Sequence, residues 1–119
     1  MVTNIVLLQD VRIPSTRNDT MSFTLCATTV HCVANCLFDA DKLEWDTFDA
    51  QFTKTGFAQC LAQFREHGQA DLTEGQCALE LAETEKGVSI QVHCNGTKSW
   101  NLQGFTEIPD STYEALDII

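Results

Sequence analysis

The chain has 119 residues, of which 44% are hydrophobic and 20% charged, which predicts one folded domain over residues 1–119 and excludes a disordered chain. Its 17 acidic side chains outnumber the 7 basic ones, and the formal net charge is −10. A surface of that sign repels phosphate groups, so we expect no nucleic-acid or membrane binding and, if a macromolecule binds, a basic protein partner.

The first expected element is a strand over residues 2–13, which are rich in aliphatic and β-branched side chains. Its apolar run ends at Gln9 and Asp10, and no basic segment precedes it. These are the features of neither a secretory signal nor a membrane-spanning helix. We therefore expect a cytoplasmic protein whose six cysteines stay reduced.

After a turn-rich loop at residues 14–20, the alternating residues 21–37 predict one long strand. One face would carry Phe23, Leu25, Ala27, Thr29, His31 and Val33. The other face has little charge and would carry Cys26, Thr28, Val30, Cys32 and Ala34. Such a face needs cover from the protein's own helices or from another subunit, so we expect a homodimer or larger homo-oligomer.

Residues 39–49, DADKLEWDTFD, contain five carboxylates and one lysine and predict an acidic connector or a short helix. An aromatic side chain ringed by charge is typical of an interface anchor, although Trp45 fits a core position as well. The acidic clusters at 39–49, 71–86 and 107–117 also fit solvated surfaces that keep a protein dispersed. The residues that we predict to bind a partner are Asp39, Asp41, Glu44, Trp45, Asp46 and Asp49.

A helix is expected over residues 56–67, with Thr55 as its N-cap and Gly68 at its end. Its buried stripe would consist of Phe57, Cys60, Leu61 and Phe64. An alternative function follows from this helix, namely a small-ligand-binding domain with a pocket between sheet and helix. The residues that would line this pocket are Phe57, Phe64 and Trp100.

Residues 77–82 and 88–93 alternate between apolar and polar side chains and predict a hairpin. The hairpin would pair Leu81 with Ile90 and Leu79 with Val92. The same register sets Cys77 opposite Cys94, which makes these two the best candidates for a disulfide.

A second hairpin follows. A three-residue loop at 94–96 would set Ile90 beside Trp100, and we prefer it to a two-residue Asn95-Gly96 turn. The segment 111–114, STYE, matches a capping box and predicts a short C-terminal helix. The expected fold is α+β, with an antiparallel sheet of about five strands and both helices packed on one face.

Two His-Cys pairs, in VHCVANC at 30–36 and VHCNG at 92–96, raise the question of metal or thiol chemistry. On a strand, Cys32 and Cys36 would stand about 13 Å apart at ~3.3 Å per residue, which is too far for one zinc ion. Only a helical HCVANC would bring them together. No catalytic triad, zinc-protease or phosphate-loop motif is present, so we expect no metal, no cofactor and no enzymatic activity.

The run FAQCLAQFREHGQADLTEGQCALELAETEKGVSIQV, residues 57–92, and the terminal STYEALDII resemble small bacterial immunity-type proteins such as the WapI-like group. The resemblance covers about half the chain and contains no motif that fixes a functional residue. It implies a non-enzymatic protein that neutralises a toxin, often a basic nuclease, by covering its active surface. The leading hypothesis is therefore a small acidic cytoplasmic binding protein, such as an immunity protein or inhibitor.

Overall fold

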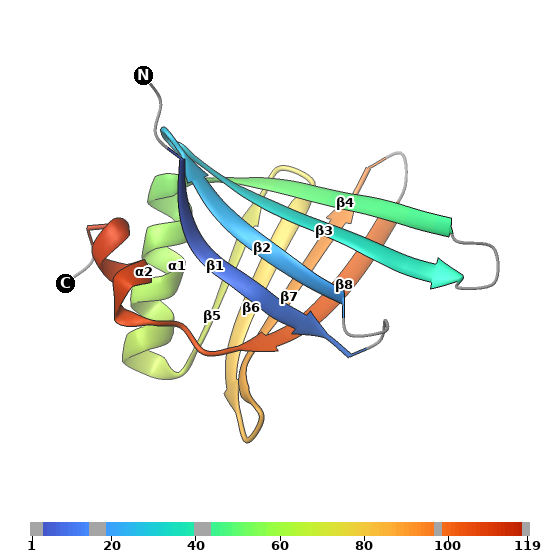
Figure 1. The fold of residues 1–119 in the computed structure, drawn as a ribbon. Helices are drawn as coiled ribbons and strands as arrows, with labels where there is room; N and C mark the ends of the chain where they lie inside the picture. The colour runs from blue at the N-terminus through green and yellow to red at the C-terminus, as the bar shows by residue number, and fades with distance from the viewer. Residues whose placement is uncertain (1–3, 15–18, 40–43, 97–98, 118–119) are drawn as a thin grey trace.

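The computed structural model describes residues 4–14, 19–39, 44–96 and 99–117. Its elements follow the chain as shown in Figure 1. They are β1 Asn4–Ile13, β2 Asp19–Cys26, β3 Thr29–Asp39, β4 Glu44–Thr53, α1 Lys54–His67, β5 Gln69–Glu74, β6 Cys77–Thr84, β7 Gly87–Asn95, β8 Ser99–Thr106 and α2 Asp110–Ala115.

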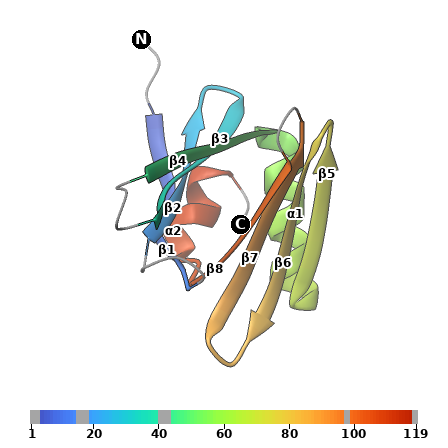
Figure 2. The same ribbon diagram turned by 90° about the vertical axis from the view of Figure 1, so that its right-hand side faces the viewer.

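The strands of the described chain form one sheet of eight strands in the order β4-β3-β2-β1-β8-β7-β6-β5. Each half, β1–β4 and β5–β8, is an antiparallel meander, and β1 joins the halves by pairing Arg12 with Phe105 of β8. The sheet curves so strongly that its two halves face each other (Figure 1, Figure 2). Helix α1 connects the two edge strands β4 and β5 along the chain.

The expected fold of about five strands with helices on one face is wrong, because the described chain is mainly β-sheet. Residues 21–37 do not form one strand but turn back at Ala27 and Thr28 between β2 and β3. Ala27 has a φ of 56°, a left-handed conformation that a tight reversal needs and that alanine rarely adopts. Neither Ala27 nor Thr28 is a residue that predicts a tight turn, so the turn was not expected.

The turn changes which side chains of β3 face inward. Phe23 lies directly opposite Cys32, and the core side of β3 carries Val30, Cys32 and Ala34, all at most 2% exposed. Three of the five residues on the face that was expected to need another subunit are thus covered by the protein's own core, while Cys26 is half-buried and Thr28 is exposed at the turn. Val33 belongs to the opposite, outer face and is 37% exposed.

The acidic segment 39–49 was also expected as a connector or helix, which is wrong because β3 and β4 occupy most of it. Along β4, Phe48, Ala50 and Phe52 are buried. Their neighbours Thr47, Asp49, Gln51 and Thr53 are exposed. This alternation has the period of a strand with one face on the core and one in water.

Helix α1 packs its four predicted residues, Phe57, Cys60, Leu61 and Phe64, into the core, as the sequence pattern indicated. The ring of Phe57 stacks on that of Phe23 of β2, with 5.7 Å between ring centroids. The helix ends at Gly68, whose φ of 79° confirms the predicted C-cap. The N-cap is Thr53 and not Thr55, because the Thr53 hydroxyl accepts from the N–H of Gly56 at 3.0 Å.

The β6–β7 hairpin has the predicted register, with Leu81 opposite Ile90 and Cys77 opposite Cys94. Cys77 and Cys94 form a disulfide, so the expectation that all cysteines are free is wrong for this pair. The preferred register of β7 with β8 is also wrong, since Ile90 lies opposite Gly104 and Cys94 opposite Trp100.

A glycine at position 104 lets β1 pack closely on β8. A side chain there would place its Cβ 2.6 Å from Cγ1 of Val11 and 3.0 Å from the carbonyl oxygen of Arg12. This close approach lies next to the Arg12–Phe105 pair that joins the two halves of the sheet.

The C-terminal helix α2 packs against β1. The buried hydroxyl of Thr112 donates a hydrogen bond to the carbonyl of Leu7, and Tyr113 and Leu116 are buried. The predicted capping box does not form, because Pro109 is the N-cap and no side chain caps the helix.

Candidate interaction surface on the β3–β4 hairpin

The residues predicted to bind a partner belong to the β3–β4 hairpin. Asp39 is the last residue of β3 and pairs with Glu44, the first residue of β4; Trp45 and Asp46 follow, and Asp49 lies opposite Val33. Asp41 lies outside the described residues. The structure therefore brings five of the six predicted positions together on one hairpin.

This hairpin extends past the rest of the sheet. Strand β3 pairs with β2 from Thr29 to Ala34 but pairs with β4 as far as Asp39. Figure 1 shows the outer parts of β3 and β4 projecting beyond the ends of β1 and β2. The outer part of the hairpin is therefore accessible to another molecule.

The backbone of β4 has an outward-facing row of hydrogen-bonding groups. In an antiparallel pair, opposite residues alternately exchange two backbone hydrogen bonds or none. The N–H of Lys54 donates to the carbonyl of Thr28 at 2.8 Å, so the adjacent pair of Thr29 and Thr53 exchanges none. The N–H and C=O groups of Thr53 therefore point away from β3. The same holds for every second residue before it along β4, namely Gln51, Asp49 and Thr47.

The inner end of this edge is closed by Glu74 of β5. One carboxylate oxygen of Glu74 accepts from the N–H of Thr53 at 2.7 Å and the other from the Thr53 hydroxyl at 2.7 Å. Among the described residues, no backbone group pairs with the outward N–H groups of Thr47, Asp49 and Gln51. We call the exposed side chains of these three residues, with their outward backbone groups, the β4 edge surface.

Replacing Glu74 with glutamine is expected to lower the free energy of unfolding by about 1–2 kcal/mol, because two charge-assisted hydrogen bonds at the helix N-cap become neutral or are lost. Thermal melting followed by circular dichroism measures the change. Glu85→Gln removes the same charge at the exposed β6–β7 turn and should leave the melting temperature unaltered. Equal stability of the two variants would contradict the role given to Glu74.

The second acidic cluster, residues 71–86, reaches this surface through Glu74 at its inner end. Residues 71–86 lie on β5, β6 and their turns, and residues 107–117 lie on and around α2. In the second cluster Asp71 of β5 lies directly opposite Glu80 of β6. In the third, Asp117 forms an ion pair with Lys54 at 3.5 Å.

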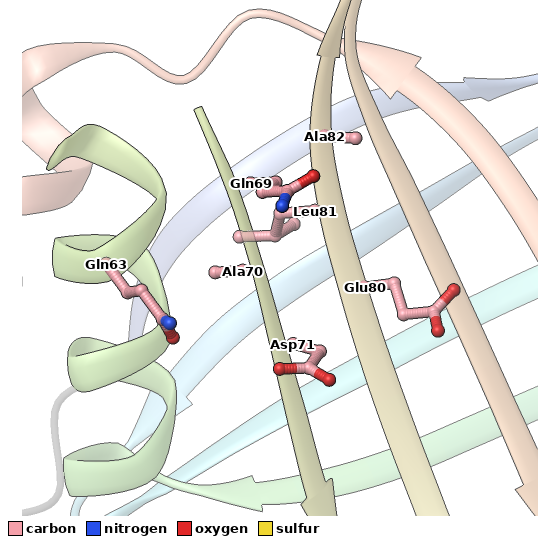
Figure 3. A pocket seen from close by; sticks show the side chains of 7 residues that line it. All are labelled: Gln63, Gln69, Ala70, Asp71, Glu80, Leu81 and Ala82. Atoms are coloured by element: carbon pink, nitrogen blue, oxygen red, sulfur yellow. The ribbon is translucent and has the colours of Figure 1, made fainter. Parts of the chain in front are cut away.

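A hollow of about 360 Å³ opens between α1 and strands β5 and β6 (Figure 3). Its lining consists of Gln63, Gln69, Ala70, Asp71, Glu80, Leu81 and Ala82. The carboxylates of Asp71 and Glu80 have no histidine, hydroxyl or basic side chain beside them in this lining. The charged side chains of this lining are therefore both acidic.

The residues predicted to line a ligand pocket lie apart. Phe57 and Phe64 fill the core at 1% and 7% exposure, and neither lines any hollow described here. Trp100 is half-buried, and its ring lies 5.2 Å from that of Phe48. It borders a shallow hollow of about 510 Å³ at the β7–β8 turn, together with His93, Asn95, Ser99 and Asn101.

The free thiols of Cys32 and Cys60 are poor candidates for chemistry. Burial, with a smaller contribution from Asp49, raises the pKa of Cys32 to about 12. Burial, with a smaller contribution from Asp71, raises the pKa of Cys60 to about 11. Both thiols stay protonated near neutral pH, and a protonated thiol is neither a good nucleophile nor a metal ligand.

Within the part of the chain that the structure describes, no group of three or more His, Cys, Asp or Glu side chains is arranged to hold a metal ion. In the same part, none of the helices has the length and apolar character needed to cross a membrane. Comparison with protein families, with curated proteins and with solved structures finds no match to this chain.

The acidic positions were predicted from the sequence, but strand β4 and its edge surface were not, and of the predicted residues Asp49 alone belongs to that surface. The signal was present in EWDTFDAQFT, residues 44–53, where apolar and polar side chains alternate from Thr47 to Thr53. The density of carboxylates and the expectation of a helix obscured that period of two. Because β4 was not predicted as a strand, neither the projecting hairpin nor its open edge followed from the sequence.

Proposed function

We propose that this protein is a small acidic interaction protein that binds a basic protein partner through the β4 edge surface. As an immunity protein or inhibitor, it would cover the active surface of that partner. The observation that carries the proposal is the projecting β3–β4 hairpin, whose strand β4 contains three acidic residues, Glu44, Asp46 and Asp49, and no lysine or arginine.

The charge of strand β4 supports a cationic partner. Its sequence, EWDTFDAQFT, contains carboxylates and no lysine or arginine, and Asp49 is exposed. A cationic partner would therefore meet complementary charge along this strand. Complementary charge also speeds association, so binding should be fast and should weaken as salt increases.

Two further properties belong to this proposal. The cytoplasmic location expected from the sequence stays a prediction. The bonded pair of Cys77 and Cys94 favours an oxidising compartment instead, since cytoplasmic thiols are usually reduced. Homo-oligomerisation stays a prediction, although three of the five residues on the strand face on which it rested are covered by the core.

A charge reversal tests the proposed surface. Asp49→Lys should weaken binding to an alternating lysine–valine peptide of nine residues about tenfold at low salt, because it places like charge at the contact. Asp110→Lys makes the same change of net charge at α2, away from the hairpin, and should have a much smaller effect. Calorimetry at two salt concentrations measures both, and equal losses would contradict binding at the β4 edge surface.

A further inference from the structure

The direction of the β4 backbone groups indicates how a partner binds. We propose that the partner adds an extended basic strand antiparallel to β4, hydrogen-bonded to the backbone of Thr47, Asp49 and Gln51. This inference rests on the proposed function and specifies its mode of binding. An edge strand with unpaired N–H and C=O groups is a template for another strand, and such strand addition recurs in peptide recognition.

The open part of the edge has a defined extent. Glu74 occupies the N–H of Thr53, so an added strand meets the edge from Gln51 outward. Thr47, Asp49 and Gln51 present their outward N–H and C=O groups at every second residue and have exposed side chains. Thr47 lies opposite Asn35, in the part of the hairpin that projects beyond β2 (Figure 1), whereas Asp49 and Gln51 lie opposite residues of β3 that still pair with β2. Strand β4 is the last strand of the sheet on this side, so no strand of the described chain lies beside these three residues.

The negative charge of β4 favours pairing with a basic strand over pairing with β4 of a second copy of this chain. Strand β4 contributes three carboxylates and no cation, so pairing β4 with itself would gather six carboxylates in one two-stranded ribbon. That arrangement is destabilising in any register because no basic residue of either strand offsets it. A strand with lysine or arginine at alternate positions instead places cations on the face of the sheet that carries Asp49.

The geometry also fixes which backbone groups of the added strand are used. Asp49 directs its N–H and C=O outward, so the residue opposite it in an antiparallel strand exchanges two hydrogen bonds with it. Directly opposite side chains lie on the same face of the sheet. The cationic residues of the added strand must lie beside Asp49, so their backbone N–H groups point toward β4. The residues between the cationic ones direct their backbone N–H groups to solvent.

Backbone methylation of the lysine–valine peptide tests this arrangement at constant charge. Methylation of the lysine nitrogens removes the donors that face β4 and should weaken binding at least tenfold. Methylation of the valine nitrogens removes only donors that face solvent and should change binding less than threefold. Loss confined to the valine-methylated peptide would overturn the antiparallel arrangement, because a parallel strand uses the alternate set of N–H groups.

Two outcomes separate the inference from the function on which it rests. Equal binding of all three peptides, still weakened by Asp49→Lys, would overturn strand addition and leave charge-driven binding at this surface in place. Failure of every peptide to bind at low salt would overturn both.

A change on the protein side tests the same edge. Gln51→Pro removes one outward N–H without removing a hydrogen bond of the β3–β4 pair, since that N–H points away from β3. We expect it to weaken binding of the unmethylated peptide about tenfold, while Gln51→Thr, which keeps the N–H, binds like the parent. Circular dichroism verifies that both variants are folded, and a proline variant that is folded and binds normally would overturn the inference.

Amide hydrogen exchange gives a readout that charge alone would not alter. In the free protein, the amides of Thr47, Asp49 and Gln51 should exchange faster than those of Ala50 and Phe52, which point toward β3. Addition of the unmethylated peptide should slow exchange at the first three. Unaltered exchange at a peptide concentration that saturates binding would overturn strand addition.

Discussion

Replacement of Phe57 by alanine is expected to lower the free energy of unfolding by about 3–5 kcal/mol, a large share of the stability of a domain of this size. Phe57 is 1% exposed, and its ring stacks on Phe23 at 5.7 Å between centroids. Removing the ring leaves a cavity where α1 meets β2, and surrounding side chains close such cavities only in part.

Urea denaturation followed by circular dichroism measures this loss. Gln59→Ala on the exposed side of α1 is the matched control, since it shortens a side chain on the same helix without opening a cavity. It should alter the free energy of unfolding by less than about 0.5 kcal/mol. A Phe57→Ala variant as stable as this control would show that α1 does not anchor the core as described.

Loss of the Cys77–Cys94 disulfide is expected to cost about 3 kcal/mol. The bond joins residues 17 apart in sequence on the neighbouring strands β6 and β7. A cross-link of this span restricts the unfolded chain, so its removal increases the conformational entropy of unfolding. Cys94 is also 7% exposed and lies opposite Trp100, so the bond is continuous with the core.

The measurement compares urea midpoints of the parent protein and of the Cys77→Ala, Cys94→Ala double variant, each with and without a thiol reductant. The parent should shift to a lower midpoint on reduction, whereas the double variant should not respond. Cys26→Ala serves as the control, because Cys26 is a free thiol and its removal leaves the disulfide intact. A parent midpoint that is insensitive to the reductant would contradict the stabilising role.

The stability variants and the binding variants report on different parts of the molecule. Phe57 and the disulfide lie in the core, whereas Asp49 and Gln51 are exposed on the β3–β4 hairpin. Changes at the exposed positions should therefore alter peptide binding with little effect on unfolding. This separation allows a loss of binding to be assigned to the surface rather than to a loss of fold.

Local patterns in the sequence were sufficient for α1 and for the β6–β7 hairpin. The buried stripe of α1 and its terminating Gly68 follow from residues within one helical repeat of each other. The pairing of Cys77 with Cys94 follows from alternation on both sides of one short turn. In these elements the decisive contacts join residues close in the chain, so sequence alone determined them.

Tertiary contacts decided the turn between β2 and β3 and the way the two halves of the sheet join. The reversal at Ala27 is favoured because it places Val30, Cys32 and Ala34 on the core, and no glycine, proline or asparagine at the turn indicates it. The joining of the two halves of the sheet is likewise a long-range contact, since β1 packs on β8 at Gly104, where a side chain would collide with it.

The candidate surface shows the same division. Composition and charge alone identified the acidic residues of segment 39–49 and the basic character of a partner that would suit them. The tertiary structure decided that Glu44, Asp46 and Asp49 lie on an edge strand with open backbone groups, since an edge is defined by the absence of a neighbouring strand. That absence is a property of the whole sheet, in which β4 is last in order, and no local pattern in the sequence specifies it.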